Sequence, residues 1–141
     1  MATEKLRLRI ATQENIKFDE DVNMVIMRCI TGDMGILPKH EAYSAILDFG
    51  VLRILNDVTE ERRMAVFGGM AQVRDNTVTI LANDAQWPED IDIALVEAEY
   101  EKAQRRIQES VDDLEIQKDQ VVLRRTLVQI EVSSYPILAG K

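Results

Sequence analysis

The chain of 141 residues contains only one cysteine and one histidine, so several kinds of site cannot be built from it. Cys29 cannot form a disulfide within the chain, which suits a reducing compartment. His40 alone cannot supply a two-histidine metal site, and a second histidine for a catalytic pair is missing. We therefore expect no metal centre, no catalytic residues and no bound cofactor, and we interpret His40 as a packing or hydrogen-bonding residue.

Long apolar runs are also missing, since none approaches the roughly 20 residues that a membrane-spanning helix needs. The N-terminal segment MATEKLRLRI has neither the apolar stretch of a signal peptide nor the character of a transit peptide. A net charge of −8 would repel a phosphate backbone and an anionic lipid surface. These features favour a cytoplasmic protein that binds no nucleic acid and does not insert into a membrane.

Glycine-rich phosphate loops are absent as well. Residues 32–35 (GDMG) lack the Lys-Ser/Thr pair of a P-loop and the third glycine of a dinucleotide-binding loop. We interpret this segment and Gly68-Gly69 as turns or bulges that need unusual backbone angles. Asp48 to Gly50, Asn56-Asp57 and Asp75-Asn76 are further predicted turns.

The pattern of apolar residues divides the chain near Trp87-Pro88. Before this point short runs such as LRLRIA and TVTILA alternate with period two, which predicts a β-sandwich or barrel. After it Ile93, Val96 and Tyr100 begin a seam with helical spacing, and a second stripe follows from Ile116. We predict an antiparallel pair of helices over residues 89–108 and 111–132, with Ser110 as the N-cap of the second.

Two arginine pairs, Arg105-Arg106 and Arg124-Arg125, lie on these predicted helices. The simpler interpretation is a solvated helix face, and the alternative is a basic patch for an acidic partner. Since no catalytic group of residues is found, the residues favour a binding or coupling subunit over an enzyme.

Five motifs in order resemble the epsilon subunit of the F-type rotary ATP synthase. Residues 32–40 (GDMGILPKH) are similar to the family's G-E-x-G-I-x-P-x-H loop, with Asp33 in place of glutamate. Residues 45–54 (AILDFGVLRI) and 68–73 (GGMAQV) resemble the next two motifs, with Gln72 where glutamate is usual. Residues 78–82 (VTILA) and Ile91-Asp92 complete the resemblance, which covers nearly the whole chain.

This resemblance implies an α+β fold, with an N-terminal ten-stranded β-sandwich and a C-terminal antiparallel two-helix hairpin. It implies a rotor-binding domain over residues 1–86 and a regulatory hairpin over 87–141. The expected partners are the gamma subunit, the ring of c subunits, and the beta and alpha subunits of the catalytic head. The expected location is the cytoplasmic face of a bacterial plasma membrane, with a plastid thylakoid as the alternative. A free-standing ligand-binding module with the same fold is the alternative function.

The resemblance also assigns residues to contacts. Asp33, Met34, Pro38 and His40 are expected to meet the c ring and the gamma subunit. In an extended hairpin, the two arginine pairs are expected to meet an acidic segment of the beta subunit.

Some members of the family bind ATP in the compact hairpin, through an I/L-D-x-x-R-A motif and two arginines of the second helix. Here Ile91, Asp92 and Arg125 match that pattern, whereas Leu95 and Gln129 replace two of its three arginines. Arginine is the residue best shaped for bidentate phosphate contacts, so we expect this degenerate site not to bind ATP.

Overall fold

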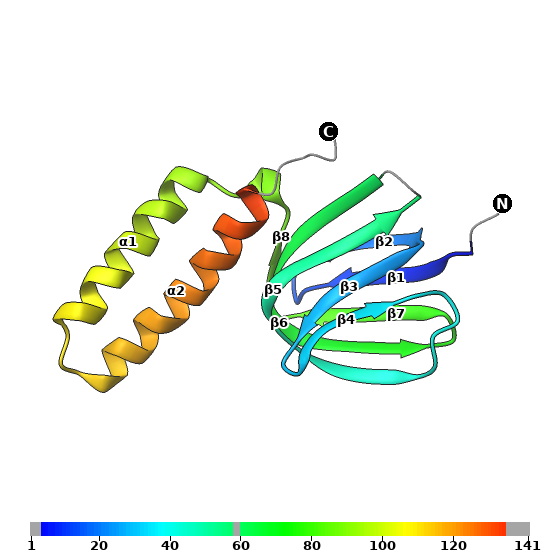
Figure 1. Ribbon diagram of the computed structural model, residues 1–141, viewed down its shortest axis with the longest axis horizontal. Coiled ribbons are helices and arrows are strands. Elements are labelled where there is room, and N and C mark those ends of the chain that lie inside the picture. The colour runs from blue at the N-terminus through cyan, green and yellow to red at the C-terminus, as the bar shows by residue number, and fades with distance from the viewer. Residues whose placement is uncertain (1–3, 58–59, 135–141) are drawn as a thin grey trace.

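The computed structural model describes residues 4–57 and 60–134 of the chain. A sandwich of strands is followed by a short 3-10 helix and a hairpin of two α-helices, which confirms the predicted α+β class (Figure 1). The elements are β1 (Leu6–Ala11), β2 (Ile16–Val22), β3 (Met24–Cys29), β4 (Gly32–Ile36), β5 (Tyr43–Asn56), β6 (Glu60–Arg74), β7 (Thr77–Ala82), β8 (Ala85–Gln86), η1 (Pro88–Asp90), α1 (Ile93–Glu109) and α2 (Asp113–Ser134).

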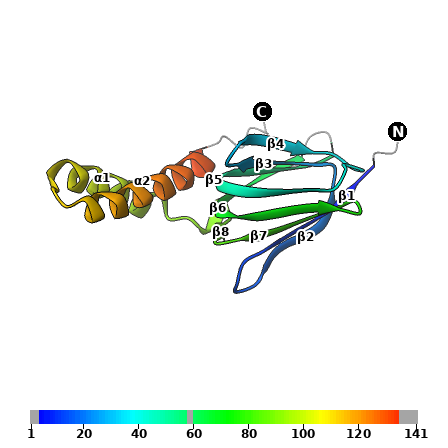
Figure 2. The same cartoon turned by 90° about the horizontal axis from the view of Figure 1, so that it is seen from below.

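The strands form one continuous sheet in the order β2-β1-β7-β6-β5-β3-β4, with β8 paired to β6. All pairs are antiparallel except β1 with β7. The sheet folds over into two layers that pack face to face. The long strands β5 and β6 pair with each other, and each runs through both layers. Residues 43–47 of β5 and 69–74 of β6 lie in the layer of β7, β1 and β2. The other half of β6 pairs with β8 at residues 65–66, and β5 pairs with β3 at residues 53–55 and again at Leu47. Figure 2 shows β5 and β6 between β3 and β4 on one side and β7 and β2 on the other.

The prediction of ten strands is wrong, because the described residues form eight. β5 has 14 residues and β6 has 15, and each runs without a break from one layer into the other. The predicted turns at residues 48–50 and at Gly68-Gly69 lie inside these two strands. Gly68 and Gly69 have φ angles of 82° and 137°, so they serve as bends within a strand and not as its end.

The core between the layers is built from the alternation that the sequence shows. Leu6, Leu8 and Ile10 of β1 are buried, while Arg7 and Arg9 point outward and form ion pairs with Asp19 of β2. Val78 and Ile80 of β7 are buried in the same way. The period-two prediction is therefore confirmed for these strands.

The hairpin follows the predicted helical spacing, but its caps differ from those expected. Asp92 caps α1 by accepting a hydrogen bond from the Leu95 backbone N–H at 3.3 Å. Ser110 ends α1 and is not the N-cap of α2. Asp112 takes that position, because its carboxylate accepts the Leu114 N–H at 3.0 Å just before α2 begins.

Only the second helix of the hairpin makes the main contacts with the sandwich, and the first helix packs on the second. α1 packs chiefly against α2, through a seam in which Val96 and Ala103 are buried. α2 in turn packs against β5 and β6 through Val128 and Val132. Trp87, the first residue of the predicted regulatory segment, packs against the sandwich core, with its ring centroid 6.1 Å from that of Phe18. The division into domains of separate function stays a prediction.

Candidate functional site

Four exposed apolar side chains form a row across the outer face of one layer. Ile46 of β5 lies opposite Met70 of β6, which lies opposite Leu81 of β7. Ile30 extends the row, since its backbone N–H donates to the carbonyl oxygen of Ile46 at 3.0 Å. Between 57% and 60% of each side chain is exposed. We call Ile30, Ile46, Met70 and Leu81 the apolar row.

The next row on the same face is polar, which makes the apolar row a local feature. Ser44, Gln72 and Thr79 lie opposite one another on the same three strands, one pleat further along. A shallow depression of about 470 Å³ adjoins the apolar row, with Met70 and Leu81 among its lining residues. Contiguous apolar residues on an otherwise polar sheet face are typical of a surface that another protein covers. Sequence reasoning missed this row, although alternation at Ile46, Met70 and Leu81 could have indicated it.

The segment 32–40, which resembles a loop motif of the family and in which 32–35 were interpreted as a turn or a bulge, is mostly a strand. Residues 32–36 form β4 at the edge of the sheet, and only Pro38 and Lys39 form a turn. Gly32 starts the strand with a φ of 122°, the unusual backbone angle expected for it, whereas Gly35 pairs with Ile26 inside the strand and is not among the glycines with a positive φ. The expected contact residues therefore lie on either side of Ile36, and not around one turn.

The four side chains assigned to this contact have different surroundings. Asp33 is exposed near the start of β4, and its carboxylate pairs with Arg28 Nε at 3.2 Å. Met34 packs against the sandwich core, and Pro38 is half-buried. His40 lies beyond the far end of β4, with Nδ1 2.8 Å from the Glu41 carbonyl oxygen and its ring edge against Tyr43. Asp33 and His40 are thus not neighbours.

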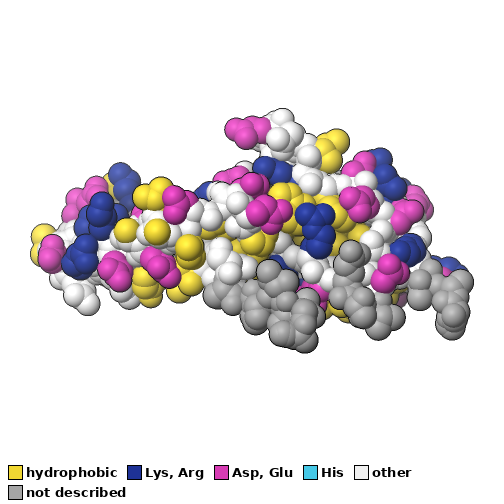
Figure 3. All heavy atoms as spheres, turned by 90° about the horizontal axis from the view of Figure 1, so that it is seen from above, with side chains coloured by type: hydrophobic (Ala, Val, Ile, Leu, Met, Phe, Trp, Pro, Cys, Tyr) yellow, Lys and Arg dark blue, Asp and Glu magenta, His cyan; other side chains and the backbone are white. Residues whose placement is uncertain are grey.

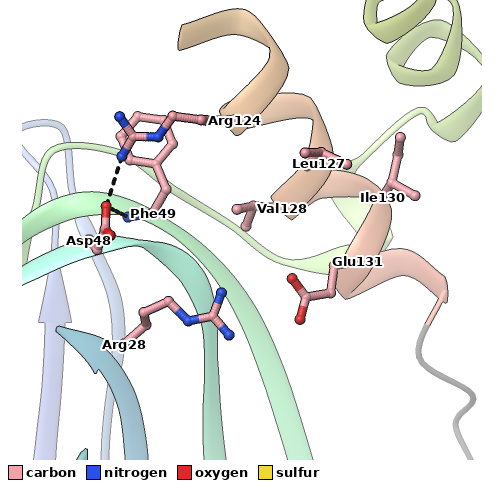
Figure 4. A pocket seen from close by; sticks show the side chains of 8 residues that line it. All are labelled: Arg28, Asp48, Phe49, Arg124, Leu127, Val128, Ile130 and Glu131. Carbon is pink, nitrogen blue, oxygen red and sulfur yellow. Dashed lines mark hydrogen bonds and ion pairs between the residues drawn. The ribbon is translucent and has the colours of Figure 1, made fainter. Parts of the chain in front are cut away.

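A second candidate surface is the junction of the hairpin with the sandwich. Arg124 of α2 pairs with Asp48 of β5 at 2.8 Å and lies over the Phe49 ring, 4.6 Å from its centroid. A groove of about 450 Å³ opens beside this pair (Figure 4). Arg28 and Glu131 face each other across it, while Leu127, Val128 and Ile130 form its apolar wall.

Arg125, the next residue, points to the other side of the junction. It pairs with Asp84 at 2.7 Å and lies over the Phe67 ring, 4.0 Å from its centroid. One turn later the Gln129 amide donates to the Gln86 side-chain oxygen at 2.7 Å. The apolar centre of the junction contains Val128 and Val132 with Val51, Ala65 and Phe67 of the sandwich. The junction is therefore small, and charged pairs lie on both sides of it.

Comparison with known proteins agrees with the resemblance read from the motifs. Residues 5–88 match the family of the ATP synthase delta/epsilon chain, beta-sandwich domain. The ATP synthase epsilon chain of Alkalihalophilus pseudofirmus is 38% identical over 108 residues, 77% of this chain and 80% of that one. The epsilon chain of an Exiguobacterium species is 31% identical over 128 residues, 90% of this chain and 94% of that one. The chain belongs to the epsilon-chain family of the F-type ATP synthase.

Solved structures show the same fold. The Euglena gracilis mitochondrial ATP synthase, solved as its OSCP/F1/c-ring assembly, contains a chain similar at a TM-score of 0.81 and 23% identity. The similarity covers 96% of this chain and 85% of that one. The central stalk and c ring of the Tetrahymena thermophila enzyme contain another similar chain, with a TM-score of 0.60. These two chains therefore share the fold seen here.

The arginines that the family resemblance assigned to the beta subunit are mostly engaged within this epsilon-type chain. Arg124 and Arg125 form ion pairs with Asp48 and Asp84 of the sandwich. Arg106 of α1 forms an ion pair with Asp119 of α2 at 2.9 Å. This hydrogen bond raises the pKa of the Arg106 guanidinium. Arg105 forms no ion pair within the described residues. Contact with a beta subunit stays a prediction for all four.

Most residues of the degenerate ATP site expected from the family are engaged in contacts with other residues of the same chain. Ile91 packs against the junction, Asp92 caps α1, and Arg125 is paired with Asp84. Gln129 is buried against Gln86, and Leu95 is exposed.

No group of side chains suited to a metal is found in residues 4–57 and 60–134. Burial raises the pKa of the Cys29 thiol. Over the same residues, no helix is long and apolar enough to cross a membrane.

Proposed function

We propose that the chain is a non-catalytic rotor subunit of the central stalk of an F-type ATP synthase. In this role it couples ion-driven rotation of the c ring to ATP synthesis in the catalytic head. It works at the cytoplasmic face of a bacterial plasma membrane. The observation that carries the proposal is the apolar row, which a partner subunit must cover, in a chain of the epsilon family.

The apolar row is assigned to the gamma subunit. The test compares Met70→Glu with Gln72→Glu, which adds the same charge one pleat away on the same strand and face. We expect Met70→Glu to abolish retention of the chain on the purified complex, because it places a carboxylate in an apolar interface. Gln72→Glu should be retained. Equal retention of the two variants would remove this face from the interface.

The contact with the c ring is assigned to Asp33, Met34, Pro38 and His40. Asp33→Lys tests it, because Asp33 is exposed and its ion pair with Arg28 contributes little to stability. We expect an almost unchanged melting temperature of the isolated chain and weaker ion pumping by the reassembled complex. A large loss of stability with normal pumping would make Asp33 a scaffold residue.

The hairpin is proposed to restrain ATP hydrolysis. Its support is the small junction, through which α2 alone provides the main contacts with the sandwich. Acidic and basic side chains are interspersed over the hairpin, with exposed apolar ones between them (Figure 3). Removal of residues 91–141 keeps Trp87 in place and should raise hydrolysis by the complex. Unchanged hydrolysis in the truncated complex would show that the hairpin is no brake.

A further inference from the structure

One side chain at the end of the sandwich away from the hairpin joins three segments that lie far apart along the chain. Asn76 belongs to the turn between β6 and β7. Its Oδ1 accepts the backbone N–H of Lys39 at 2.8 Å, and its Nδ2 donates to the carbonyl oxygen of Lys5 at 2.8 Å. Figure 1 shows the start of β1, next to Lys5, at the end of the sandwich opposite the hairpin.

Asparagine is suited to this position for two reasons. Its carboxamide carries both a donor and an acceptor, so a single side chain can satisfy a carbonyl oxygen and an N–H at once. The φ angle of Asn76 is 58°, in the left-handed region that asparagine tolerates better than most residues. Its own carbonyl oxygen accepts the N–H of Arg7 at 3.0 Å, beside the parallel pairing of β1 with β7.

The segment that Asn76 holds has few other contacts. Residues 37–42 connect β4 to β5, and in the described part of the chain no backbone–backbone hydrogen bond outside the helices and strands involves them. Lys39 has a φ angle of 66°, and such a conformation of a non-glycine residue persists only where its surroundings fix it. The ion pair of Lys39 with Glu4 at 3.0 Å joins two exposed side chains and contributes little. The bond from the Lys39 N–H to Asn76 is therefore the main restraint.

We propose that Asn76 is a positioning residue, which holds residues 38–40 in the orientation that they present to the c ring. Pro38 precedes Lys39 and His40 follows it, so the backbone conformation of Lys39 sets the directions of both neighbouring side chains. Asn76 acts through Lys39 and not through a contact of its own. The inference rests on the proposed contact of Pro38 and His40 with the ring, but the order of the segment is a property of the isolated chain.

A pair of glycine variants separates this role from a general effect on the turn. Asn76→Gly removes both side-chain bonds and keeps the turn, because glycine adopts a positive φ without strain. Asp75→Gly is the matched control, since Asp75 also has a positive φ, 52°, and its 88% exposed side chain makes only a long ion pair with Arg74 in the described residues. The two variants share the same gain of freedom in the unfolded chain.

Two further variants separate the contacts of Lys39. Asn76→Asp keeps an acceptor for the Lys39 N–H and loses the donor to Lys5. Glu4→Gln removes the ion pair with Lys39 and leaves Asn76 intact. We therefore expect both variants to keep the segment ordered.

The first measurement is backbone ¹⁵N NMR relaxation on the isolated full-length chain. We expect order parameters of about 0.85 for the amides of residues 39–42 in the parent chain and in Asp75→Gly, and below about 0.6 in Asn76→Gly. Exchange of the Lys39 amide proton with water should become roughly three- to ten-fold faster in Asn76→Gly. A residue that only stabilises the whole fold would change the melting temperature without this local loss of order.

Three results on the isolated chain would overturn the positioning role. They are equal order in Asn76→Gly and Asp75→Gly, disorder in Asn76→Asp as large as in Asn76→Gly, and disorder in Glu4→Gln as large as in Asn76→Gly. The second of these would show that the Lys39 N–H bond is not what holds the segment, and the third would assign the restraint to the ion pair.

The second measurement is the ratio of ion pumping to ATP hydrolysis in the reassembled complex. We expect Asn76→Gly to lower this ratio and Asp75→Gly to leave it at the parent value. A disordered segment with the parent ratio would overturn the proposed contact of Pro38 and His40 with the ring, while the effect of Asn76 on the segment would stand. Failure of the inference and failure of the proposed contact are thus distinguished.

Discussion

A Cβ atom on Gly69 would lie 2.2 Å from the carbonyl oxygen of Leu81 on the neighbouring strand. The φ angle of Gly69 is 137°, which L side chains rarely adopt. We expect Gly69→Ala to lower the free energy of unfolding by about 3 kcal/mol or more, since backbone strain and a backbone clash add together. Urea denaturation of the isolated chain measures this loss.

Gly32→Ala is the matched control for Gly69→Ala. Gly32 also has a positive φ, 122°, but nothing lies within 4 Å of an added Cβ. Its loss should be about 1 kcal/mol, from backbone strain alone. Equal losses for the two variants would show that the contact with Leu81 relaxes easily and that strain dominates at both positions.

The parts of the fold that the sequence predicts are those set by local periodicity. Alternation in β1 and β7 fixes which residues enter the core, and the spacing from Ile93 predicts the helical seam. The turn predicted at residues 48–50 is wrong, because these residues lie inside β5, whose path depends on its pairing with a distant strand. Gly68 and Gly69, interpreted as a turn or a bulge, have the unusual φ angles expected, and β5 pairs with β6 on both sides of them, so the strand continues through the bend.

The candidate site was harder to predict from the sequence than the fold, because its contacts join residues that are far apart along the chain. Arg124 and Arg125 have an ordinary helix-surface pattern, and their partners Asp48 and Asp84 lie 76 and 41 residues away along the chain. The apolar row depends on the register of three strands, which a single sequence does not fix.

The ion pair between Arg106 and Asp119 predicts that replacing either residue by alanine lowers the stability of the hairpin by a different amount. The Asp119 side chain is 9% exposed and the Arg106 side chain 51% exposed. Arg106→Ala leaves a buried carboxylate without its arginine and should clearly destabilise the hairpin, whereas Asp119→Ala leaves a solvated guanidinium and should destabilise it less. Hydrogen exchange of the α1 amides in each variant measures the difference. Equal protection in the two variants would mean that water reaches Asp119 easily.

Glu61 predicts a dependence of stability on acid pH. Arg53 donates to it at 2.8 and 3.2 Å, and this bonding, helped by Arg63, lowers the pKa of the carboxyl below its ordinary value of 4.5. A lowered folded-state pKa stabilises the fold above about pH 4.5, and this contribution disappears as the pH falls through the folded-state pKa. Glu61→Gln should therefore lose less stability on acidification than the parent chain.

Urea denaturation at about pH 6.5 and about pH 3.5 compares the two chains. Glu20→Gln, at an exposed glutamate without an ion pair in the described residues, is the control and should keep the parent dependence. If Glu61→Gln keeps the parent dependence too, Glu61 contributes nothing to the acid sensitivity.

The contacts around Arg125 predict that the isolated chain does not bind ATP at physiological concentration. Arg125 is already paired with Asp84, and a nucleotide phosphate would have to displace that carboxylate. Gln129 is bonded to Gln86 and Leu95 carries no charge, so two of the three guanidiniums of an ATP-binding hairpin are missing. At roughly 1.5–3 kcal/mol for each charged hydrogen bond, their loss amounts to several orders of magnitude in affinity.

Isothermal titration of the isolated chain with ATP tests this prediction, and Asp84→Asn separates the two causes. We expect no measurable binding to the parent chain and none to Asp84→Asn, because one released arginine cannot replace three. Binding by Asp84→Asn alone would identify the internal carboxylate, and not the missing arginines, as the main barrier. Micromolar to low-millimolar binding by the parent chain that disappears in Arg125→Ala would show that the remaining residues suffice for a nucleotide.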